Sequence, residues 1–186
     1  KNLKQQWEAE TERLYHLDHT PLPGQSEIIG AIWETIGARD VLMSAAGSQP
    51  GDLHKLWRAR TPNSYHMEYG YSCMGYEIPA SLGVKMADPE REVYVWVGDG
   101  TYLMNPTEIL TAVQEGLKVT IIVVDNSGFG SIGGLSASLG SAGFGTRFRQ
   151  RDPQTGQLSG APLVVDFAAN AASLGAQVFT PVSVAE

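Results

Sequence analysis

The sequence is poor in features that would tie it to a disulfide-rich or membrane setting. Its single cysteine, Cys73, cannot form a disulfide within the chain, which favours a reducing compartment. No apolar run approaches the ~20 residues that a membrane-spanning helix needs. The polar stretch 1–13 also lacks the apolar segment of a signal peptide. We therefore expect a cytoplasmic protein that does not partner with a membrane.

Positive charge is also scarce. The chain has 13 Lys and Arg residues against 20 Asp and Glu residues, so its formal net charge is −7. This balance argues against a nucleic-acid partner, although a local basic pocket for a phosphate stays compatible with it. Hydrophobic residues make up 42% and charged residues 18%, as in an ordinary globular protein. The length of 186 residues predicts one domain with at most a short appendage.

Apolar patterns of the strand and helix types alternate along the chain. This alternation predicts an α/β layered domain, with a mainly parallel sheet flanked by helices. We expect Ser26 to cap the first helix of the domain and Asp166 to cap the last one. The expected helices are 1–16, 26–37, 53–57, 75–86, 106–115 (with Ile109, Leu110 and Val113 on one face) and 166–174. The expected strands are 41–45, 65–71 (a strand with a turn), 93–97, 119–124 and 176–179. The expected loops are 47–51 and the long segment 127–160, which would contain one or two short helices.

Short oxygen-bearing side chains follow two of the predicted strands directly. Asp99 comes after one strand and Asn126 after the next, and the carboxyl ends of parallel strands share one edge of a sheet. A carboxylate, an amide and a loop carbonyl suit Mg²⁺ that also binds phosphate oxygens. The glycines beside Asp99 would let a diphosphate approach, and the N–H groups of Gly100 and Thr101 would hold its oxygens. A plain tight turn followed by a helix cap is the alternative.

Gly98-Asp99-Gly100 together with Asn126 resembles the thiamine-diphosphate motif of enzymes such as acetolactate synthase and pyruvate decarboxylase. The resemblance implies the diphosphate-binding (PP) fold of that family. It also implies that Mg²⁺ is held by Asp99, by the Asn126 side chain and by the Gly128 carbonyl. The family usually has Asn-Asn where this chain has Asp125-Asn126, and we expect the extra charge of Asp125 to face elsewhere.

The likeness to this family extends to the loops around the motif. Ser72-Cys73-Met74-Gly75-Tyr76 resembles the segment in which an apolar side chain, here Met74, supports the thiazolium ring and a carbonyl, here that of Ser72, receives the 4′-amino group. Met74 could instead simply fill the core. The loop 47–49 resembles the one that reaches the diphosphate. The remaining residues that we expect to bind the cofactor are Ser48, Gln49, Phe129 and Gly130.

A more specific resemblance covers nearly the whole chain. The segments 45–57, 65–77 and 128–145 are similar to the trihydroxycyclohexanedione hydrolases of myo-inositol catabolism. This likeness implies cleavage of a ring C–C bond in a cyclic 1,2-dione to give 5-deoxyglucuronate, with the cofactor as electron sink. The alternatives are an acetolactate-synthase-like carboligase or decarboxylase acting on 2-oxo acids, and an isolated cofactor-binding fragment without activity.

The family resemblance also implies a part that these residues do not supply. In the family, a glutamate on a separate pyrimidine-binding domain activates the cofactor, and that domain comes from the other subunit, so we expect a homodimer or homotetramer. Glu68 and Glu77 lie in the diphosphate-binding domain and are not candidates for this role. We expect residues 1–24 to be a helix and linker from a preceding domain. Residues 25–186 would then form the cofactor domain, truncated at its C-terminal end.

Other patterns in the sequence are less informative. Residues 128–133 fit the G-x-G-x-x-G pattern of a dinucleotide-binding turn. The acid expected at the end of the following strand is missing, because Asp152 is the nearest one and does not lie in a strand-like segment, so NAD is disfavoured. Arg147, Arg149 and Arg151 are typical of a solvated face, with contact to a substrate or anion as the alternative. His54 and His66 lie near the proposed cofactor loops. Each could be a structural residue or could take part in substrate binding or proton transfer.

Overall fold

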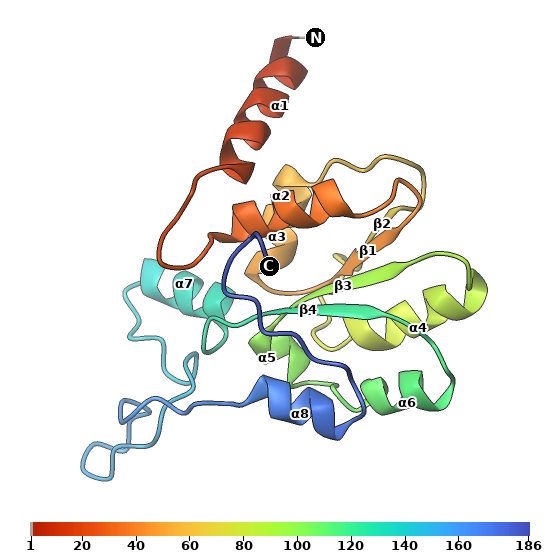
Figure 1. Cartoon of the computed structure of the whole chain (residues 1–186). Coiled ribbons are helices and arrows are strands. Elements are labelled where there is room, and N and C mark those ends of the chain that lie inside the picture. The colour runs from red at the N-terminus through yellow and green to blue at the C-terminus, as the bar shows by residue number, and fades with distance from the viewer. Residues whose placement is uncertain (1) are drawn as a thin grey trace.

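The computed structural model describes residues 2–186 and contains a parallel sheet with helices on both faces (Figure 1). The four strands lie in the order β2-β1-β3-β4, and every neighbouring pair is parallel. Their bounds are β1 Val41–Ser44, β2 Tyr65–Met67, β3 Val93–Gly98 and β4 Thr120–Val124. The predicted α/β architecture is therefore confirmed, and β1 and β3 lie at the centre of the sheet.

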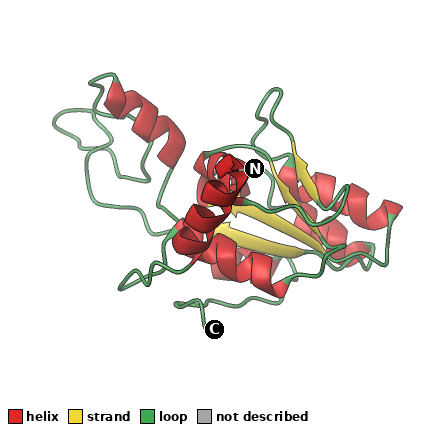
Figure 2. Ribbon diagram, turned by 90° about the horizontal axis from the view of Figure 1, so that it is seen from above, coloured by secondary structure: helices red, strands yellow, loops and turns green. Residues whose placement is uncertain are grey.

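Helices cover both faces of this sheet. On one face lie α2 (Gln25–Thr35) and α3 (Ser48–Leu56), and α1 (Asn2–Tyr15) packs against α2. On the other lie α4 (Glu77–Ala87), α5 (Asp99–Tyr102), α6 (Glu108–Gln114) and α8 (Phe167–Ser173). The helix α7 (Gly130–Ser138) stands to one side of these layers, and none of its residues is buried (Figures 1 and 2). Within residues 2–186, no helix combines the length and apolar character needed to cross a membrane.

The core follows the alternation of side chains along the central strands. Leu42 and Trp96 are fully buried and pack with Ile29 beneath the face covered by α2 and α3. Val95 and Val97 point the opposite way and pack against α4 and α6. Because successive residues of a strand face opposite sides, these apolar runs can fill two hydrophobic layers at once.

The N-terminal helix α1 packs on α2 and on the end of α3. The Trp7 indole N–H donates to the Lys55 carbonyl at 2.7 Å, and the Tyr15 hydroxyl donates to the Leu56 carbonyl at 2.6 Å. The exposed His16 ring lies 3.3 Å from the Glu34 carboxylate, which links α1 to α2 at the surface. The predicted boundary at residue 24 stays a prediction.

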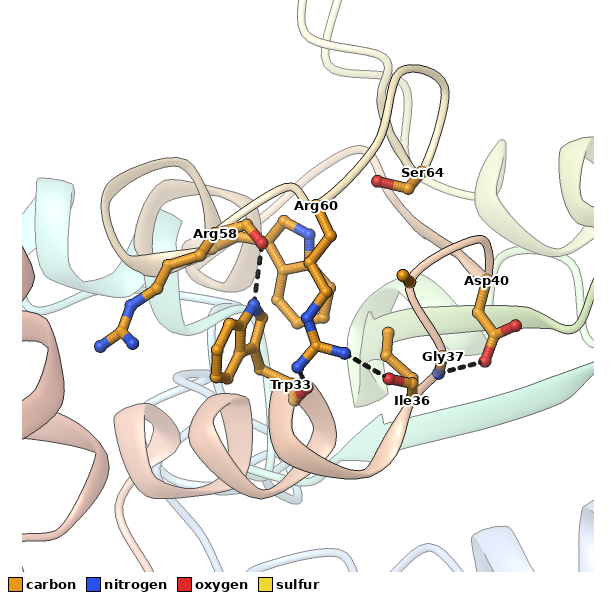
Figure 3. A pocket seen from close by; sticks show the side chains of 9 residues that line it. Trp33, Ile36, Gly37, Asp40, Arg58, Arg60 and Ser64 are labelled. Atoms are coloured by element: carbon orange, nitrogen blue, oxygen red, sulfur yellow. Dashed lines mark hydrogen bonds between the residues drawn. The ribbon is translucent and has the colours of Figure 1, made fainter.

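The last turn of α2 is held by the segment that connects α3 to β2 (Figure 3). Arg60 Nη1 donates to the Ile36 carbonyl at 2.6 Å, and its guanidinium lies 4.1 Å from the centroid of the Trp33 ring. The Trp33 indole N–H donates to the Arg58 carbonyl at 2.8 Å. The Arg60 hydrogen bond satisfies a carbonyl that the end of α2 leaves free.

Replacing Arg60 with alanine should therefore lower the free energy of unfolding by about 1–2 kcal/mol, since a charge-assisted hydrogen bond and a cation–π contact are lost together. Urea denaturation followed by circular dichroism measures this change. Arg39→Ala is the matched control: Arg39 is exposed and only approaches Asp88, at 3.9 Å, so its loss should change stability by less than about 0.5 kcal/mol. Equal effects of the two variants would contradict the anchoring role of Arg60.

Two predicted helix starts are wrong. The N-cap of α2 is Gly24 rather than Ser26, because the Glu27 carboxylate reaches back to accept the Gly24 N–H at 2.6 Å. The segment predicted as the loop 47–51 is helical from Ser48 onward. Pro50 is compatible with this start because the first turn of a helix has no use for the N–H that proline lacks.

Near the C-terminus, one helix is confirmed and one strand is wrong. The Asp166 carboxylate accepts the Ala169 N–H at 2.8 Å and caps α8, as predicted. Residues 176–179 form no strand, because β4 pairs only with β3 within the described chain, and Phe179 is 76% exposed. The predicted apolar face of α6 is also wrong. Ile109 and Ala112 are its buried residues, whereas Leu110 and Val113 are exposed.

Candidate functional site

A cleft of about 300 Å³ opens at the carboxyl ends of β1, β3 and β4. Its volume lies at the lower end of the range of small-molecule sites. The walls come from the loops after these three strands, from the segment before α4 and from the start of α7. Every residue predicted to bind a cofactor lines this cleft: Ser48, Gln49, Ser72, Met74, Asp99, Gly100, Thr101, Asn126, Gly128, Phe129 and Gly130.

The parallel register explains why these side chains meet. Gly98 at the end of β3 pairs with Val124 at the end of β4, so the residues that follow the two strands emerge side by side. Asp99 and Asn126 both lie there, as the strand pattern predicted. The edge formed by strand carboxyl ends is the usual ligand site of such sheets.

Asp99 is completely buried and accepts two backbone hydrogen bonds. Its Oδ1 accepts the Gly100 N–H and its Oδ2 accepts the Gly128 N–H, each at 2.8 Å. Burial raises the pKa of Asp99, the two N–H groups oppose this rise, and the Asp125 carboxyl adds to it. A carboxyl with a raised pKa favours folding most at acid pH, and this contribution is lost as the pH rises through the raised pKa. A cation beside Asp99 would offset that loss.

The Asn126 side chain supplies the second oxygen. Its Oδ1 is buried and has no hydrogen-bond partner within the described chain. Leaving a buried amide oxygen without a partner costs about 1–3 kcal/mol of stability, so a ligand that pairs with this oxygen would stabilise the site. The Asn126 carbonyl is already used, because it accepts a hydrogen bond from Arg147 at 2.6 Å. An unpaired amide oxygen and a buried carboxylate from residues of one cleft fit a hard divalent cation.

Two glycines bring the loops into close contact at this point. A Cβ on Gly128 would lie 2.3 Å from the Thr146 carbonyl oxygen, and a Cβ on Gly100 would lie 2.7 Å from the Phe129 ring. Phe129 in turn meets Phe148 edge-on at 5.9 Å. The missing side chains let the loop after β4 fold tightly over the start of α5.

The N-terminus of α3 forms another wall, which is a feature that the sequence prediction missed. Ser48 is its first residue, and the N-termini of helices attract anions such as phosphate. The buried Gln49 side chain fills the space that the glycines leave: a Cβ on Gly98 would lie 2.8 Å from its Nε2, and a Cβ on Gly47 would lie 2.7 Å from its Oε1.

The wall before α4 carries the half-buried Met74 and the exposed Ser72, whose φ is +52°. The Glu68 carboxylate shapes this segment by accepting the Tyr71 N–H at 2.9 Å and the Cys73 N–H at 2.8 Å. These two N–H groups lower the pKa of Glu68. Met74 thus borders the cleft, which favours its predicted role beside a cofactor over that of core filler.

Several residues that line the cleft were not predicted from the sequence to belong to the site. Tyr69 lines it and stacks on His54 with ring centroids 5.9 Å apart, while Ile132 and Leu135 of α7 add an apolar wall. The aromatic-rich stretch 65–71 was the available signal for Tyr69. His66 is directed to the Tyr76 hydroxyl, at 2.8 Å, and does not line the cleft.

One expectation about the site is wrong in detail, and it concerns Gly100. The exposed Asp125 carboxyl accepts the Ser127 N–H at 2.8 Å and does not line the cleft, although it adds to the raised pKa of Asp99. The Gly100 N–H is not free for a diphosphate, since Asp99, the first residue of α5, folds its carboxylate back onto it. The Gly128 N–H is likewise occupied by Asp99, which is unlike an open dinucleotide-binding turn.

Comparisons with known proteins agree with this geometry. The family model described as "Thiamine pyrophosphate enzyme, C-terminal TPP binding domain" matches residues 45–186. A 3D-(3,5/4)-trihydroxycyclohexane-1,2-dione hydrolase of Clostridium tetani is 40% identical over 203 residues, covering 96% of this chain and 32% of that protein. Hydrolases 1 and 2 of the same name from Bacillus cereus are 42% and 47% identical, over 95% and 86% of this chain and 31% and 25% of theirs. The chain thus spans about a third or less of these relatives.

Proposed function

This chain belongs to the thiamine pyrophosphate enzymes, whose C-terminal TPP-binding domain it carries, and we propose that its cleft is the cofactor site. In this proposal Mg²⁺ is bound by the Asp99 carboxylate, the Asn126 side chain and the Gly128 carbonyl, and it binds the diphosphate in turn. The single observation that supports it most is that Asn126, with its buried and unpaired Oδ1, and the buried Asp99 line the same cleft. A cation would satisfy both groups.

The remaining residues of the cleft would hold and orient the rest of the cofactor. Ser48 and the N-terminus of α3 would bind diphosphate oxygens, and Met74 would support the thiazolium ring from below. The Ser72 carbonyl would accept the amino group of the pyrimidine ring. Phe129, with Ile132 and Leu135, would keep water away from the ring. When bound, the thiazolium supplies the nucleophile and electron sink needed to break a C–C bond beside a carbonyl.

For the substrate, we propose a trihydroxylated cyclohexane-1,2-dione, as the names of the relatives indicate for those proteins. The reaction would hydrolyse one ring C–C bond and open the ring to 5-deoxyglucuronate. The chain spans about a third of the relatives, so this activity is proposed for the intact protein, with whatever segments flank the chain. A pyrimidine-binding domain, supplied by a partner subunit in a homodimer or homotetramer, would provide the activating glutamate.

A turnover assay tests this proposal. The intact protein, given thiamine diphosphate and Mg²⁺, should open the cyclic dione with a kcat/KM at least about a hundredfold above that for pyruvate, because a site built for a polar ring rejects a substrate that leaves its polar groups unpaired. Proton NMR would follow both reactions, and EDTA should stop turnover. The reverse preference would favour an acetolactate-synthase-like carboligase. Cofactor binding without turnover of either compound would favour a binding module.

A further inference from the structure

One buried carboxylate outside the proposed metal site binds two of the segments that line the cleft. Glu77, the first residue of α4, is 1% exposed and takes part in no ion pair within the described chain. Its Oε1 accepts the Ala46 N–H at 3.1 Å, and its Oε2 accepts the Gly75 N–H at 3.0 Å. A single side chain therefore joins the loop after β1 to the turn before α4.

Both joined segments carry residues of the cleft. Ala46 leads through Gly47, at φ +112°, into the N-terminus of α3 at Ser48. Gly75, at φ +89°, directly follows Met74. In each case the N–H bound by Glu77 lies within two residues of a side chain that faces the cleft. The position of the Glu77 carboxylate thus sets the spacing between the wall of Ser48 and the wall of Met74.

Packing alone does not account for a carboxylate at this place. Burial raises the pKa of Glu77, and the N–H groups of Ala46 and Gly75 only partly oppose this rise. A charge in the interior is unfavourable unless hydrogen bonds compensate for its lost hydration. An apolar residue would therefore fill this position at a lower free-energy cost of burial. A carboxylate does what an apolar residue cannot, because it accepts N–H groups from two separate loops with strong, directional bonds.

We propose that Glu77 is a positioning residue for the thiamine part of the cofactor, because it fixes the loop that leads to Ser48 at a set distance from the turn that carries Met74. This inference rests on the proposed cofactor site. The groups proposed to bind the metal do not depend on Glu77, since Asp99 is held by the N–H groups of Gly100 and Gly128. Removing the Glu77 carboxylate should therefore weaken a ligand that spans the walls of Ser48 and Met74 more than a ligand that reaches only the metal and the wall of Ser48.

The test is Glu77→Gln in the intact protein, with two ligands compared by calorimetry at saturating Mg²⁺. The amide keeps the shape of the side chain, but one accepted N–H would then face an NH₂ group. We expect affinity for thiamine diphosphate to fall about tenfold or more. Affinity for inorganic diphosphate should fall about threefold or less, because this ligand would contact the metal and the wall of Ser48 but not the wall of Met74, and so does not depend on the spacing between the two walls.

Glu108→Gln is the matched control, because Glu108 also lies in the first turn of a helix, α6, on the same face of the sheet. It makes no contact with the cleft and should change neither affinity. Amide hydrogen exchange of the wild-type protein gives a second measurement that does not depend on the variant folding. The Ala46 and Gly75 amides should be protected despite lying in loops, and Glu77→Gln should lower the protection of the amide that then faces the NH₂ group.

Each outcome decides the proposal. Equal losses for both ligands, or no loss for either, would reduce Glu77 to a stabilising residue and overturn the positioning role. Fast exchange of the Ala46 and Gly75 amides in the wild type would overturn it as well. If the wild type itself fails to bind thiamine diphosphate, the proposed function is rejected, and the positioning role with it. If the wild type binds thiamine diphosphate normally, a negative result rejects the positioning role of Glu77 and leaves the proposed function standing.

Discussion

Asp99→Ala should weaken Mg²⁺-dependent binding of thiamine diphosphate by about a hundredfold or more, which corresponds to about 3 kcal/mol. Among residues 2–186, Asp99 provides the only carboxylate that lines the cleft, which it shares with Asn126 and its unpaired Oδ1. Without it, only neutral oxygens of the protein would remain to coordinate a divalent cation, and no protein ligand would balance its charge. Calorimetric titration of the cofactor at fixed Mg²⁺ measures the effect. Unchanged cofactor affinity would show that Asp99 is not a metal ligand.

Two controls separate this loss from an effect on folding. The alanine also leaves the Gly100 and Gly128 N–H groups without their partner, which should cost about 1–3 kcal/mol for each buried group. Asp166→Ala removes another carboxylate that accepts a backbone N–H, at α8, and should lower stability without changing cofactor affinity. Asp125→Asn removes the charge beside Asp99, but Asp125 does not line the cleft. Its effect on cofactor affinity should stay within about fivefold.

The candidate site was predictable because local pattern and topology agree there. The apolar runs of β3 and β4 each end in short polar residues, and parallel pairing brings such ends to one edge. Asp99 and Asn126 therefore lie where the strand pattern placed them. The unpaired state of Asn126 Oδ1 was not predictable, because it depends on which groups of the neighbouring loops come within reach.

The parts of the fold that were mispredicted depend on contacts between distant segments. Glycines and a proline make residues 47–51 look like a loop, yet the buried Gln49 packs between the ends of β1 and β3 and the chain is helical there. Tertiary packing overrides local preference in such cases. Residues 176–179 have the composition of a strand but lack a paired neighbour among the described strands.

Glu77 illustrates the same limit at the site. An acidic residue in the first turn of a helix is a common, exposed feature that favours the helix dipole. Its burial and its bonds to Ala46 and Gly75 arise only when two loops from different parts of the chain meet. Its proposed role therefore comes from the assembled structure and could not be read from the residue type.

Gly128→Ala should impair the site as severely as the loss of Asp99, with cofactor affinity reduced about a hundredfold or more. Its φ of +153° disfavours a side chain, and a Cβ would lie 2.3 Å from the Thr146 carbonyl oxygen and 2.9 Å from the Arg147 Cα. Both neighbours are backbone atoms, so no rotamer change can relieve the clash. The loop must move, which breaks the Gly128 N–H bond to Asp99 and displaces the Gly128 carbonyl.

Gly134→Ala is the matched control for this glycine. Gly134 lies within α7, and a Cβ there would meet no atom within 4 Å. This substitution should leave cofactor affinity unchanged and stabilise the helix by up to about 1 kcal/mol, because alanine favours helices more than glycine does. Calorimetry and thermal unfolding, each with and without cofactor, compare the two variants. If Gly128→Ala bound the cofactor like the wild type, the loop 126–130 could not be the part of the cleft that holds the metal, since its backbone would have moved without consequence.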